Sequence, residues 1–366
     1  MSSRLCDGPR GRRVVIELVR DLLPEEMRRG LFELAYRADV AAGAAVTRLT
    51  FRRVGDDGGQ TPSVPSPDQL ADAIRALGSL RPDGEELVES VRRSVDTARY
   101  WQAADGDDLV AADPVVTSAL ADVGAGLARR PDAAWWQRDR SIEQWAVEFD
   151  PDGDGAPFDP APGGVQRWRE RTEAGESRAR IDRPADPTAG WSGDWWSHPW
   201  GAPHTTGVLS SGLPAGIPYV EDGFGWTRAV AIPVRGAGRT YEIHGAADWA
   251  HLCRTYPLDV TNSRRHDWYR VTGRGGRWLL PDWSRVADDW DAVHLSGWGY
   301  LTAATREIVV DAEYSSVIGG WGPDETYWLT GKVREIDEPR VHWDAEERGD
   351  PWRRVDGDGL SRRPAR

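Results

Sequence analysis

Acid–base chemistry near neutral pH would depend first on the seven histidines, all of which lie in the second half of the sequence. His294 alternates with Val293 and Leu295 in a short apolar run, so its side chain points away from theirs. A neighbouring carboxylate would complete a general acid–base pair, and Glu325 is our candidate for that partner. The sequence thus predicts His294 and Glu325 as catalytic residues, although scattered histidines are also ordinary in a chain of this length.

Anion binding would depend on the segment 263–267 (SRRHD), the densest polar cluster beside a predicted helix. Two guanidinium groups next to an imidazole could hold a phosphate or a carboxylate. Only Lys332 among the 46 basic residues is a lysine, so coding bias accounts for part of the arginine content. We expect Arg265 to bind an anionic group and His266 to assist catalysis; the competing interpretation is a solvated turn.

Tryptophan is the main compositional anomaly, with 20 residues against 5 phenylalanines. Each Trp buries about 150 to 250 Å² and carries one N–H that needs a partner, so a core can absorb about ten of them. The others line a groove or clamp a loop onto a sheet. The string GWGPDETYWL also places Asp324 and Glu325 between two tryptophans, as sugar and nucleobase sites do, although a turn that leads into a strand explains it more simply. The tryptophans that we expect to contact a ligand are Trp196, Trp200, Trp321 and Trp328.

Common catalytic and metal motifs are missing from the sequence: there is no GxSxG, GxxxxGK[ST] or HExxH, and no GxGxxG after a strand. The string DPDGDG at 150–155 imitates the first half of a calcium loop, but Ala161 stands where the twelfth position needs an acid. Cys6 and Cys253 indicate neither a disulfide nor a cysteine–metal cluster. We predict no metal and no cofactor, and we expect Cys253, on the apolar face of a helix, to be a buried thiol.

Length and charge restrict the class of protein further. The chain has 366 residues, 39% of them hydrophobic, and a formal net charge of −13. This charge argues against binding to nucleic acid or to an anionic membrane. No stretch approaches the roughly 20 apolar residues of a membrane span, and the acid-interrupted run 14–23 is not a secretory segment. We therefore expect a cytoplasmic protein whose partner is a small polar or anionic ligand or another protein.

Apolar periodicity predicts the elements that must position these residues. The N-terminal part reads as mostly helical, and the C-terminal part as an α+β domain with a mainly antiparallel sheet and two or more helices. The expected helices are 25–40, 67–77, 84–100, 114–127, 246–256 and a segment from Trp283; the expected strands are 46–54, 144–149, 227–234, 240–243, 292–295, 306–310, 314–318 and 326–330.

The distribution of apolar residues predicts the domain organisation. Residues 1–149 form the mostly helical domain, and 150–190, rich in Pro, Gly, Asp and Arg, form a linker or long surface loop. Residues 191–336 form the Trp-rich α+β domain, and 337–366 form a charged tail. We expect the ligand site where the loop 191–200, the turn at 265–266 and the hairpin 321–328 meet at one end of the sheet.

Several strings resemble a Trp-rich family of uncharacterised actinobacterial proteins. The similarity is carried by ARYWQAADGDDLVAADP, YEIHGAADWAHLCRTYPLDVTNSRRHDWYRVTG, PDWSRVADDWDAVHLSGWGYL and GWGPDETYWL, and covers most of the chain outside 150–190. The resemblance implies no activity and no site residues.

Three classes of function remain open from the sequence. We slightly favour a regulatory or immunity-type module that binds a ligand or partner in a Trp-rich C-terminal pocket, because no complete catalytic constellation is evident. The alternative is an enzyme acting on a nucleotide or sugar-nucleotide, for example by ADP-ribosyl transfer; a structural subunit is the third. A histidine and a carboxylate within hydrogen-bond reach in one pocket would favour the enzyme.

Overall fold

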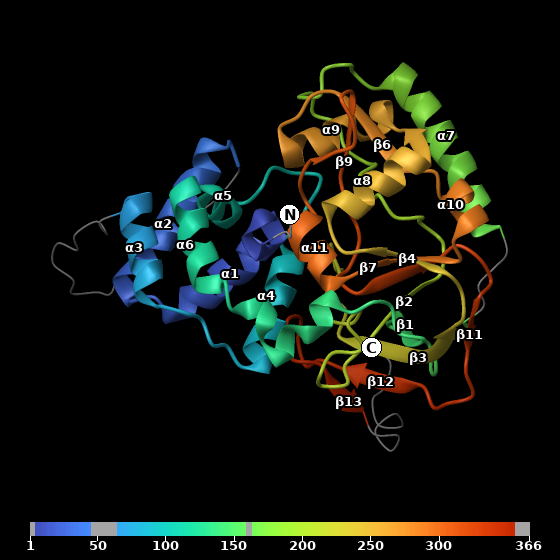
Figure 1. Ribbon diagram of the computed structural model, residues 1–366, viewed down its shortest axis with the longest axis horizontal. Coiled ribbons are helices and arrows are strands. Elements are labelled where there is room, and N and C mark those ends of the chain that lie inside the picture. The colour runs from blue at the N-terminus through green and yellow to red at the C-terminus, as the bar shows by residue number, and fades with distance from the viewer. Residues whose placement is uncertain (1–3, 45–63, 159–162, 356–366) are drawn as a thin grey trace.

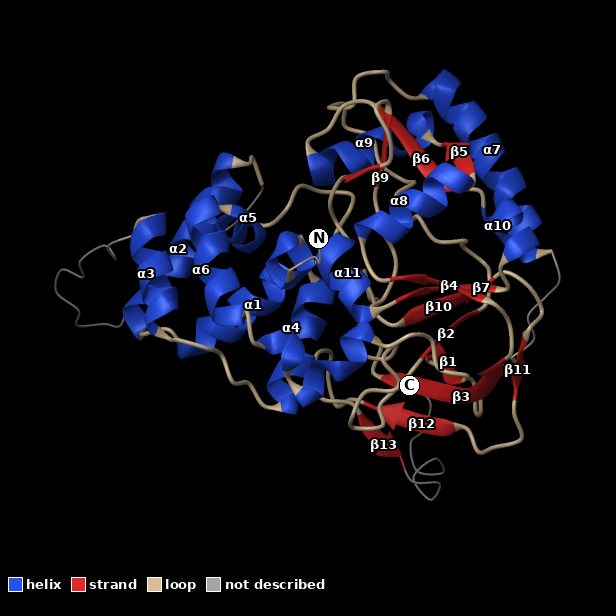
Figure 2. Cartoon of the chain, viewed as in Figure 1, coloured by secondary structure: helices blue, strands red, loops and turns tan. Residues whose placement is uncertain are grey.

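The computed structural model describes residues 4–44, 64–158 and 163–355. Its fold is α+β, as the sequence predicts: most helices come from the N-terminal part, and the sheets from the C-terminal part. Figure 1 shows the helices α1 to α6 gathered on one side and the strands on the other, and Figure 2 shows the same division by element type.

The bounds of the elements are as follows. The N-terminal part contains η1 (Leu5–Asp7), α1 (Pro9–Leu22), α2 (Glu25–Ala41), α3 (Pro67–Ala76), α4 (Gly84–Asp96), α5 (Gly106–Ala112), α6 (Pro114–Gly124), η2 (Leu127–Arg129) and η3 (Pro131–Gln137). The remainder contains β1 (Glu143–Phe149), α7 (Gly164–Asp182), β2 (His204–Thr206), β3 (Arg228–Gly236), β4 (Thr240–Ile243), α8 (Ala246–Thr255), β5 (Pro257–Asp259), α9 (Thr261–Thr272), β6 (Arg277–Pro281), α10 (Trp283–Asp289), β7 (Ala292–Leu295), α11 (Gly297–Ala303), β8 (Ile308–Val309), β9 (Tyr314–Ser316), β10 (Glu325–Trp328), β11 (Val333–Glu335), β12 (Val341–Asp344) and β13 (Arg353–Val355).

Local capping explains why the predicted N-terminal helices begin where they do. Ser66 and Gln69 form a reciprocal capping box at α3, and Asp83 and Glu86 form another at α4. The apolar stripes of these helices are buried, as their spacing predicts. The apolar run 14–22 is part of α1. The strand expected at 46–54 lies outside the described residues.

The larger sheet carries the strands that build the candidate site. Within the described ranges it has nine strands in the order β13-β12-β3-β1-β2-β10-β7-β4, with β11 also paired to β3. The pairs are antiparallel except β4 with β7. The smaller sheet has the order β5-β6-β9-β8. The predicted, mainly antiparallel sheet is confirmed.

Two segments without predicted structure contain regular elements. The stretch 150–190 includes the helix α7, which packs against α9 and α10. The pattern missed α7 because the helix buries few positions, among them Val165 and Trp168, and is polar elsewhere. The stretch 337–366 includes β12 and β13, of which β12 extends the sheet beside β3. The domain division at these segments stays a prediction.

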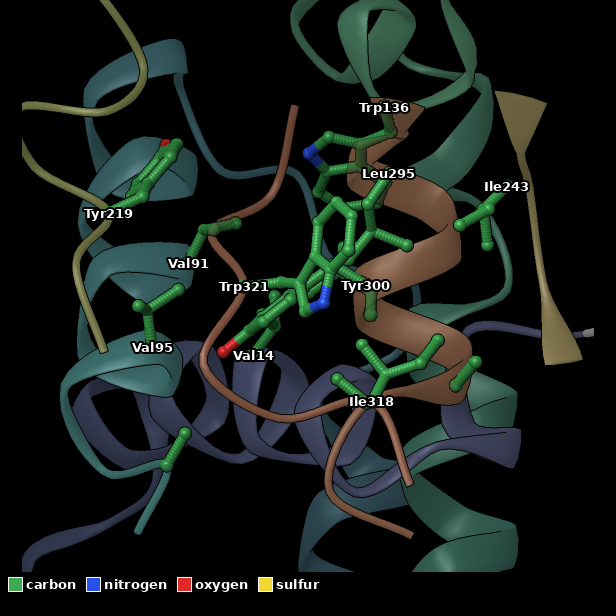
Figure 3. Close-up of a cluster of buried hydrophobic side chains, with 14 of the residues drawn as sticks. Val14, Val91, Val95, Trp136, Tyr219, Ile243, Leu295, Tyr300, Ile318 and Trp321 are labelled. Carbon is green, nitrogen blue, oxygen red and sulfur yellow. The ribbon is translucent and has the colours of Figure 1, made fainter. Parts of the chain in front are cut away.

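One large hydrophobic core, which includes many aromatic side chains, runs from the N-terminal helices to the sheet. A second, smaller cluster contains Trp328 and residues of β1 and β3. Figure 3 shows Trp321 and Tyr300 among Val14 of α1, Val91 of α4 and other apolar side chains. No single described helix has both the length and the apolar composition of a membrane span; the segments Gly106–Ala112 and Pro114–Arg129 reach that composition only as a pair bent by 84°.

Cys253 is expected to resist thiol reagents in the native state. The thiol is fully buried on α8, and burial raises its pKa to about 12, so neither access nor the reactive thiolate is available. In a Cys6→Ser background, mass spectrometry should detect alkylation of Cys253 only after denaturation. Rapid labelling of the folded protein would contradict this placement.

Candidate active site

A cavity of about 460 Å³ opens between the strands β1, β2 and β10 and two irregular segments, 195–200 and 219–226. Its lining is rich in aromatic side chains and also contains polar residues, among them the three carboxyl groups of Glu221, Asp222 and Glu325. The aromatic residues that line it are Trp145, Phe149, Trp195, Trp196, Trp200, Tyr219, Phe224, Trp226 and Tyr327, and its titratable lining includes His198, His204, Glu221 and Glu325. Such a surface suits a flat ligand that stacks between rings and is oriented by a few polar contacts.

Ser197 fixes the Trp-rich loop to the segment that precedes β10. Its backbone N–H donates to Gly319 O at 2.8 Å, and its hydroxyl accepts from Gly319 N at 2.9 Å and from Trp321 Nε1 at 3.0 Å. Ser197 is fully buried, so these bonds satisfy polar groups that water does not reach. Directly before Ser197, the loop packs through Trp195, which stacks on Tyr100 at 5.0 Å, and presents Trp196 to the cavity.

Gly320 allows this loop to approach. Its φ is +79°, and a Cβ there would lie 2.7 Å from Trp196 Cδ1 and 3.0 Å from His198 Cδ2. Gly320→Ala should therefore destabilise the protein by about 1 to 3 kcal/mol and displace Trp196. Urea unfolding and native tryptophan emission measure both effects. Gly331→Ala is the matched control, because no atom lies within 4 Å of that added Cβ, and equal stability of the two variants would contradict the predicted crowding.

His204 and Glu325 form the closest histidine–carboxylate pair of the cavity. On the antiparallel strands β2 and β10, His204 is opposite Tyr327, and Glu325 lies two residues before Tyr327 on the same face. The register therefore brings His204 Nδ1 to 2.6 Å from Glu325 Oε1. Burial acts to lower the pKa of His204, but the hydrogen bond and charge of Glu325 outweigh it and raise that pKa. Burial acts to raise the pKa of Glu325, but His204 outweighs it and lowers that pKa.

His198 is a second histidine of the cavity, and its pKa is shifted in the opposite direction to that of His204. Its ring stacks on one face of Tyr327 at 4.8 Å, and the His204 ring stacks at 5.4 Å. Burial lowers the pKa of His198 to about 4, so this imidazole is neutral at pH 7. Among the described residues its buried Nδ1 has no hydrogen-bond partner.

Glu221 is the carboxyl group that is protonated at neutral pH. Burial raises its pKa to about 8, against the hydrogen bonds that it accepts from the Tyr300 hydroxyl at 2.8 Å, Gly320 N at 2.7 Å and the Tyr100 hydroxyl at 3.0 Å. Tyr300 comes from α11, and Tyr100 from the segment after α4. Through Tyr100, the N-terminal part of the chain therefore helps to hold Glu221 at the cavity.

The two carboxyl groups are fixed on one backbone segment. Gly320 N donates to Glu221, and Gly322 N donates to Glu325 Oε2 at 2.6 Å. Two residues span at most about 7 Å, so both carboxyl groups are held near the same part of the cavity. Their environments move their pKa values apart, Glu221 upward and Glu325 downward. This is the pattern by which one site obtains a general acid and a general base.

His294 does not pair with Glu325. In the register of β7 and β10, Glu325 is opposite Leu295 and His294 is opposite Thr326, so the two side chains lie on different faces of the sheet. His294 is fully buried, with Nδ1 2.6 Å from Glu242 Oε2 and Nε2 3.2 Å from Asp324 Oδ1. The sequence-derived pairing of His294 with Glu325 is thus replaced by His204 with Glu325.

His294 should stabilise the fold in a pH-dependent way. Burial acts to lower its pKa, but Asp324 and Glu242 outweigh it and raise the pKa to about 9. Because an unfolded histidine titrates near about 6.5, this stabilisation is complete below that pH and is lost as pH rises towards 9. Urea unfolding should show that His294→Asn flattens this decline in the free energy of unfolding. The control is His251→Asn at an exposed site on α8, and the same decline in both variants would contradict the assignment.

Arg265 and His266 lie in the helix α9, and the solvated turn expected at 263–267 is wrong. A carboxylate distant in sequence caps this helix: Glu176 of α7 accepts from Asn262 N at 2.7 Å and from Ser263 N at 2.8 Å. Because this cap comes from another element, local sequence did not reveal the start of the helix. Arg265 bonds Asn262, and His266 is buried; neither residue lines the aromatic cavity.

The four selected tryptophans occupy two kinds of environment. Trp196 and Trp200 line the cavity, as expected of ligand contacts. Trp321 is fully buried, and Trp328 is 1% exposed with its Nε1 bonded to Thr205 Oγ1 at 2.8 Å. Trp321 belongs to the large core and Trp328 to a smaller cluster with residues of β1 and β3, so neither lines the cavity.

One described group has metal-like spacing: Asp139, Glu242 and His244 each place a ligand atom within 4.8 Å of the others. These side chains already have partners, since His244 Nε2 lies 3.0 Å from Asp139 Oδ1 and Glu242 bonds His294. Hydrogen bonding accounts for this cluster.

Sequence reasoning missed Glu221, His198 and His204. Both histidines belong to the string SHPWGAPH around Trp200, so their proximity to that loop was a usable signal. Glu221 has no local signal, because the tyrosines that hold it are 121 and 79 residues away. Comparison of the chain with models of protein families, with curated proteins and with solved structures gives no match.

Proposed function

We propose that the chain is an enzyme that cleaves or transfers a glycosidic bond of a ligand with a flat ring. The observation that carries this proposal is the pair of carboxyl groups, Glu221 and Glu325, that line one aromatic cavity with opposite shifts of pKa. Glycoside chemistry needs one protonated and one ionised carboxyl group on either side of the scissile bond. This proposal corresponds to the enzyme alternative from the sequence, and the histidine–carboxylate pair at 2.6 Å favours it over the binding module.

In the proposed reaction Glu221 donates its proton to the leaving-group atom as the glycosidic bond breaks. The Glu325 carboxylate stabilises the positive charge that develops on the sugar ring and accepts a proton from the attacking water or alcohol, whose oxygen forms the new bond to carbon. His204 orients Glu325 and keeps it ionised. The tryptophan faces bind the ring by stacking and exclude water from the site.

A panel of substrates tests the proposal. Aryl O-glycosides, nucleosides and nicotinamide dinucleotide should be incubated with the wild-type chain, and release of the leaving group followed by chromatography. We expect release from at least one class, with Glu325→Gln markedly slower than wild type. Failure of the wild-type chain to cleave any O- or N-glycoside would contradict the proposal.

The cellular setting also remains a proposal. We infer a cytoplasmic protein from the net charge of −13 and the sequence composition, and membership of the Trp-rich actinobacterial family from the strings quoted above. Immunoblotting of cell fractions tests the first inference: recovery with the membrane pellet would contradict it.

A further inference from the structure

A second cavity, of about 430 Å³, adjoins the aromatic cavity on the side of α7 and α9. The two cavities share Trp196, His198 and Trp200 as a common wall. The second cavity differs in charge, because Arg171 of α7 and Arg264 of α9 line it together with a single carboxylate, Asp194. A ligand seated in the aromatic cavity would therefore meet positive charge across this wall.

Arg264 is a buried cation with incomplete pairing. It is 7% exposed, and its buried Nε has no hydrogen-bond partner in the part of the chain that the structure describes. Its Nη1 donates to Ser263 Oγ at 3.2 Å, and the Asp194 carboxylate lies 3.7 Å away, too far for a hydrogen bond. The other oxygen of Asp194 is bonded by Arg183. A buried guanidinium with an unsatisfied N–H is costly, and an anion in the adjoining cavity would supply the missing acceptor.

Among the described residues, Asp194 is the one carboxylate within ion-pair distance of Arg264, and it is shared with Arg183. The carboxylate of Glu176 on α7 accepts hydrogen bonds from Asn262 N and Ser263 N at the N-terminus of α9. Arg171 adds a second guanidinium: its Nε donates to Arg167 O at 3.1 Å, and its Cζ lies 5.2 Å from the Trp200 ring. The contacts that the described residues give Arg171 are with Arg167 O and the Trp200 ring, and neither is a carboxylate. Its terminal nitrogens are thus available beside the shared wall.

We propose that the second cavity binds a phosphate or diphosphate group through Arg264 and Arg171, so that the substrate of the proposed glycosidic reaction is a phosphorylated glycoside of the nucleotide or sugar-nucleotide class. The inference rests on the proposed function for the ring and the scissile bond, but the anion subsite itself does not. The ring lies in the aromatic cavity, and the phosphate lies beyond Trp196 and Trp200. The subsite is formed by Arg264 and Arg171, and not by Arg265, which the sequence analysis selected.

Calorimetric titration of the full chain with inorganic pyrophosphate tests the subsite. We expect binding at low ionic strength, weakened about tenfold or more by Arg264→Gln and by Arg171→Gln, since a hydrogen bond to a charged group is lost in each. Arg178→Gln, an exposed position on the same helix outside the cavity lining, is the matched control and should bind as wild type. If Arg264→Gln does not fold, the exposed Arg171→Gln still decides the outcome.

The subsite and the proposed function can fail separately. Glu221→Gln should bind pyrophosphate normally, because Glu221 lies in the other cavity. Retained pyrophosphate binding with no glycosidic activity in the wild type would overturn the reaction and keep the subsite. Absence of pyrophosphate binding at millimolar concentration, equal binding by all arginine variants, or tighter binding of malonate than of pyrophosphate would overturn the subsite.

Discussion

Glu221→Gln is expected to lower the turnover of a glycosidic substrate by about 100- to 10,000-fold, the usual contribution of a general acid. Glutamine keeps the shape of the side chain and can still accept hydrogen bonds from Tyr300 and Tyr100, but it cannot give a proton to a leaving group. The measurement is kcat on the substrate identified in the panel. Glu85→Gln, an exposed position in the first turn of α4, is the control and should retain wild-type turnover.

The direction in which kcat/KM changes with pH is a second test of Glu221 as the general acid. Burial raises the pKa of Glu221 to about 8, so kcat/KM should fall as pH rises through that value and the acid loses its proton. The lowered pKa of Glu325 keeps the carboxylate ionised at neutral pH, so the acidic limb should lie below the usual range of a glutamate. A Glu221→Gln variant with wild-type turnover would remove Glu221 from the reaction.

Trp321→Ala is expected to lower the free energy of unfolding by about 3 to 5 kcal/mol, the cost of deleting a fully buried aromatic side chain. Trp321 packs against Trp249, Trp283 and Tyr327, and its N–H donates to Ser197 Oγ at 3.0 Å. Its loss leaves a cavity beneath the Trp-rich loop and removes one of the hydrogen bonds of the Ser197 hydroxyl. Urea unfolding followed by circular dichroism measures the change.

Trp200→Ala is the comparison variant for Trp321→Ala, because Trp200 lines the two cavities whereas Trp321 is fully buried. Trp200 is 57% exposed and lines both cavities, so its removal should change stability by no more than about 0.5 kcal/mol. The same change should weaken a stacked ligand by about 1 to 3 kcal/mol. Equal loss of stability in Trp200→Ala and Trp321→Ala would contradict the placement of Trp321 in the core.

The spacing of apolar residues predicted the fold class, because a helix or strand that is buried carries apolar residues in a pattern that the local sequence shows. The apolar stripe of α4 is one such pattern, and the almost continuous apolar run of β3, which is buried on both faces, is another. The helix α7 left no comparable mark, since most of its surface is polar and its contacts are made by Trp168 and few others. The N-terminus of α9 has only part of its cap in the local sequence: Asp259 accepts from Thr261 N, whereas Glu176 of α7 accepts from Asn262 N and Ser263 N.

Only the parts of the candidate site whose residues lie close together in the sequence could be predicted. The loop 191–200 and the segment 321–328, a turn that leads into the single strand β10, do meet, and Glu325, Trp196 and Trp200 line the cavity. Which histidine pairs with Glu325 depends on the strand register. His204 lies opposite Tyr327 and reaches Glu325, whereas His294 lies opposite Thr326 and contacts Asp324. Register, and the distant tyrosines that hold Glu221, follow from tertiary packing rather than from spacing along the chain.

A site-resolved titration of the Glu221 carboxyl group tests the central claim most directly, because it needs no substrate. Carbon-13 NMR of the chain labelled at glutamate side chains, with the Glu221 signal assigned by its absence in Glu221→Gln, follows that carboxyl through the pH range. We expect the Glu221 carboxyl group to stay protonated at neutral pH and to ionise with a pKa of about 8. An ordinary glutamate pKa of about 4.3 for Glu221 would contradict its role as the general acid of the cavity.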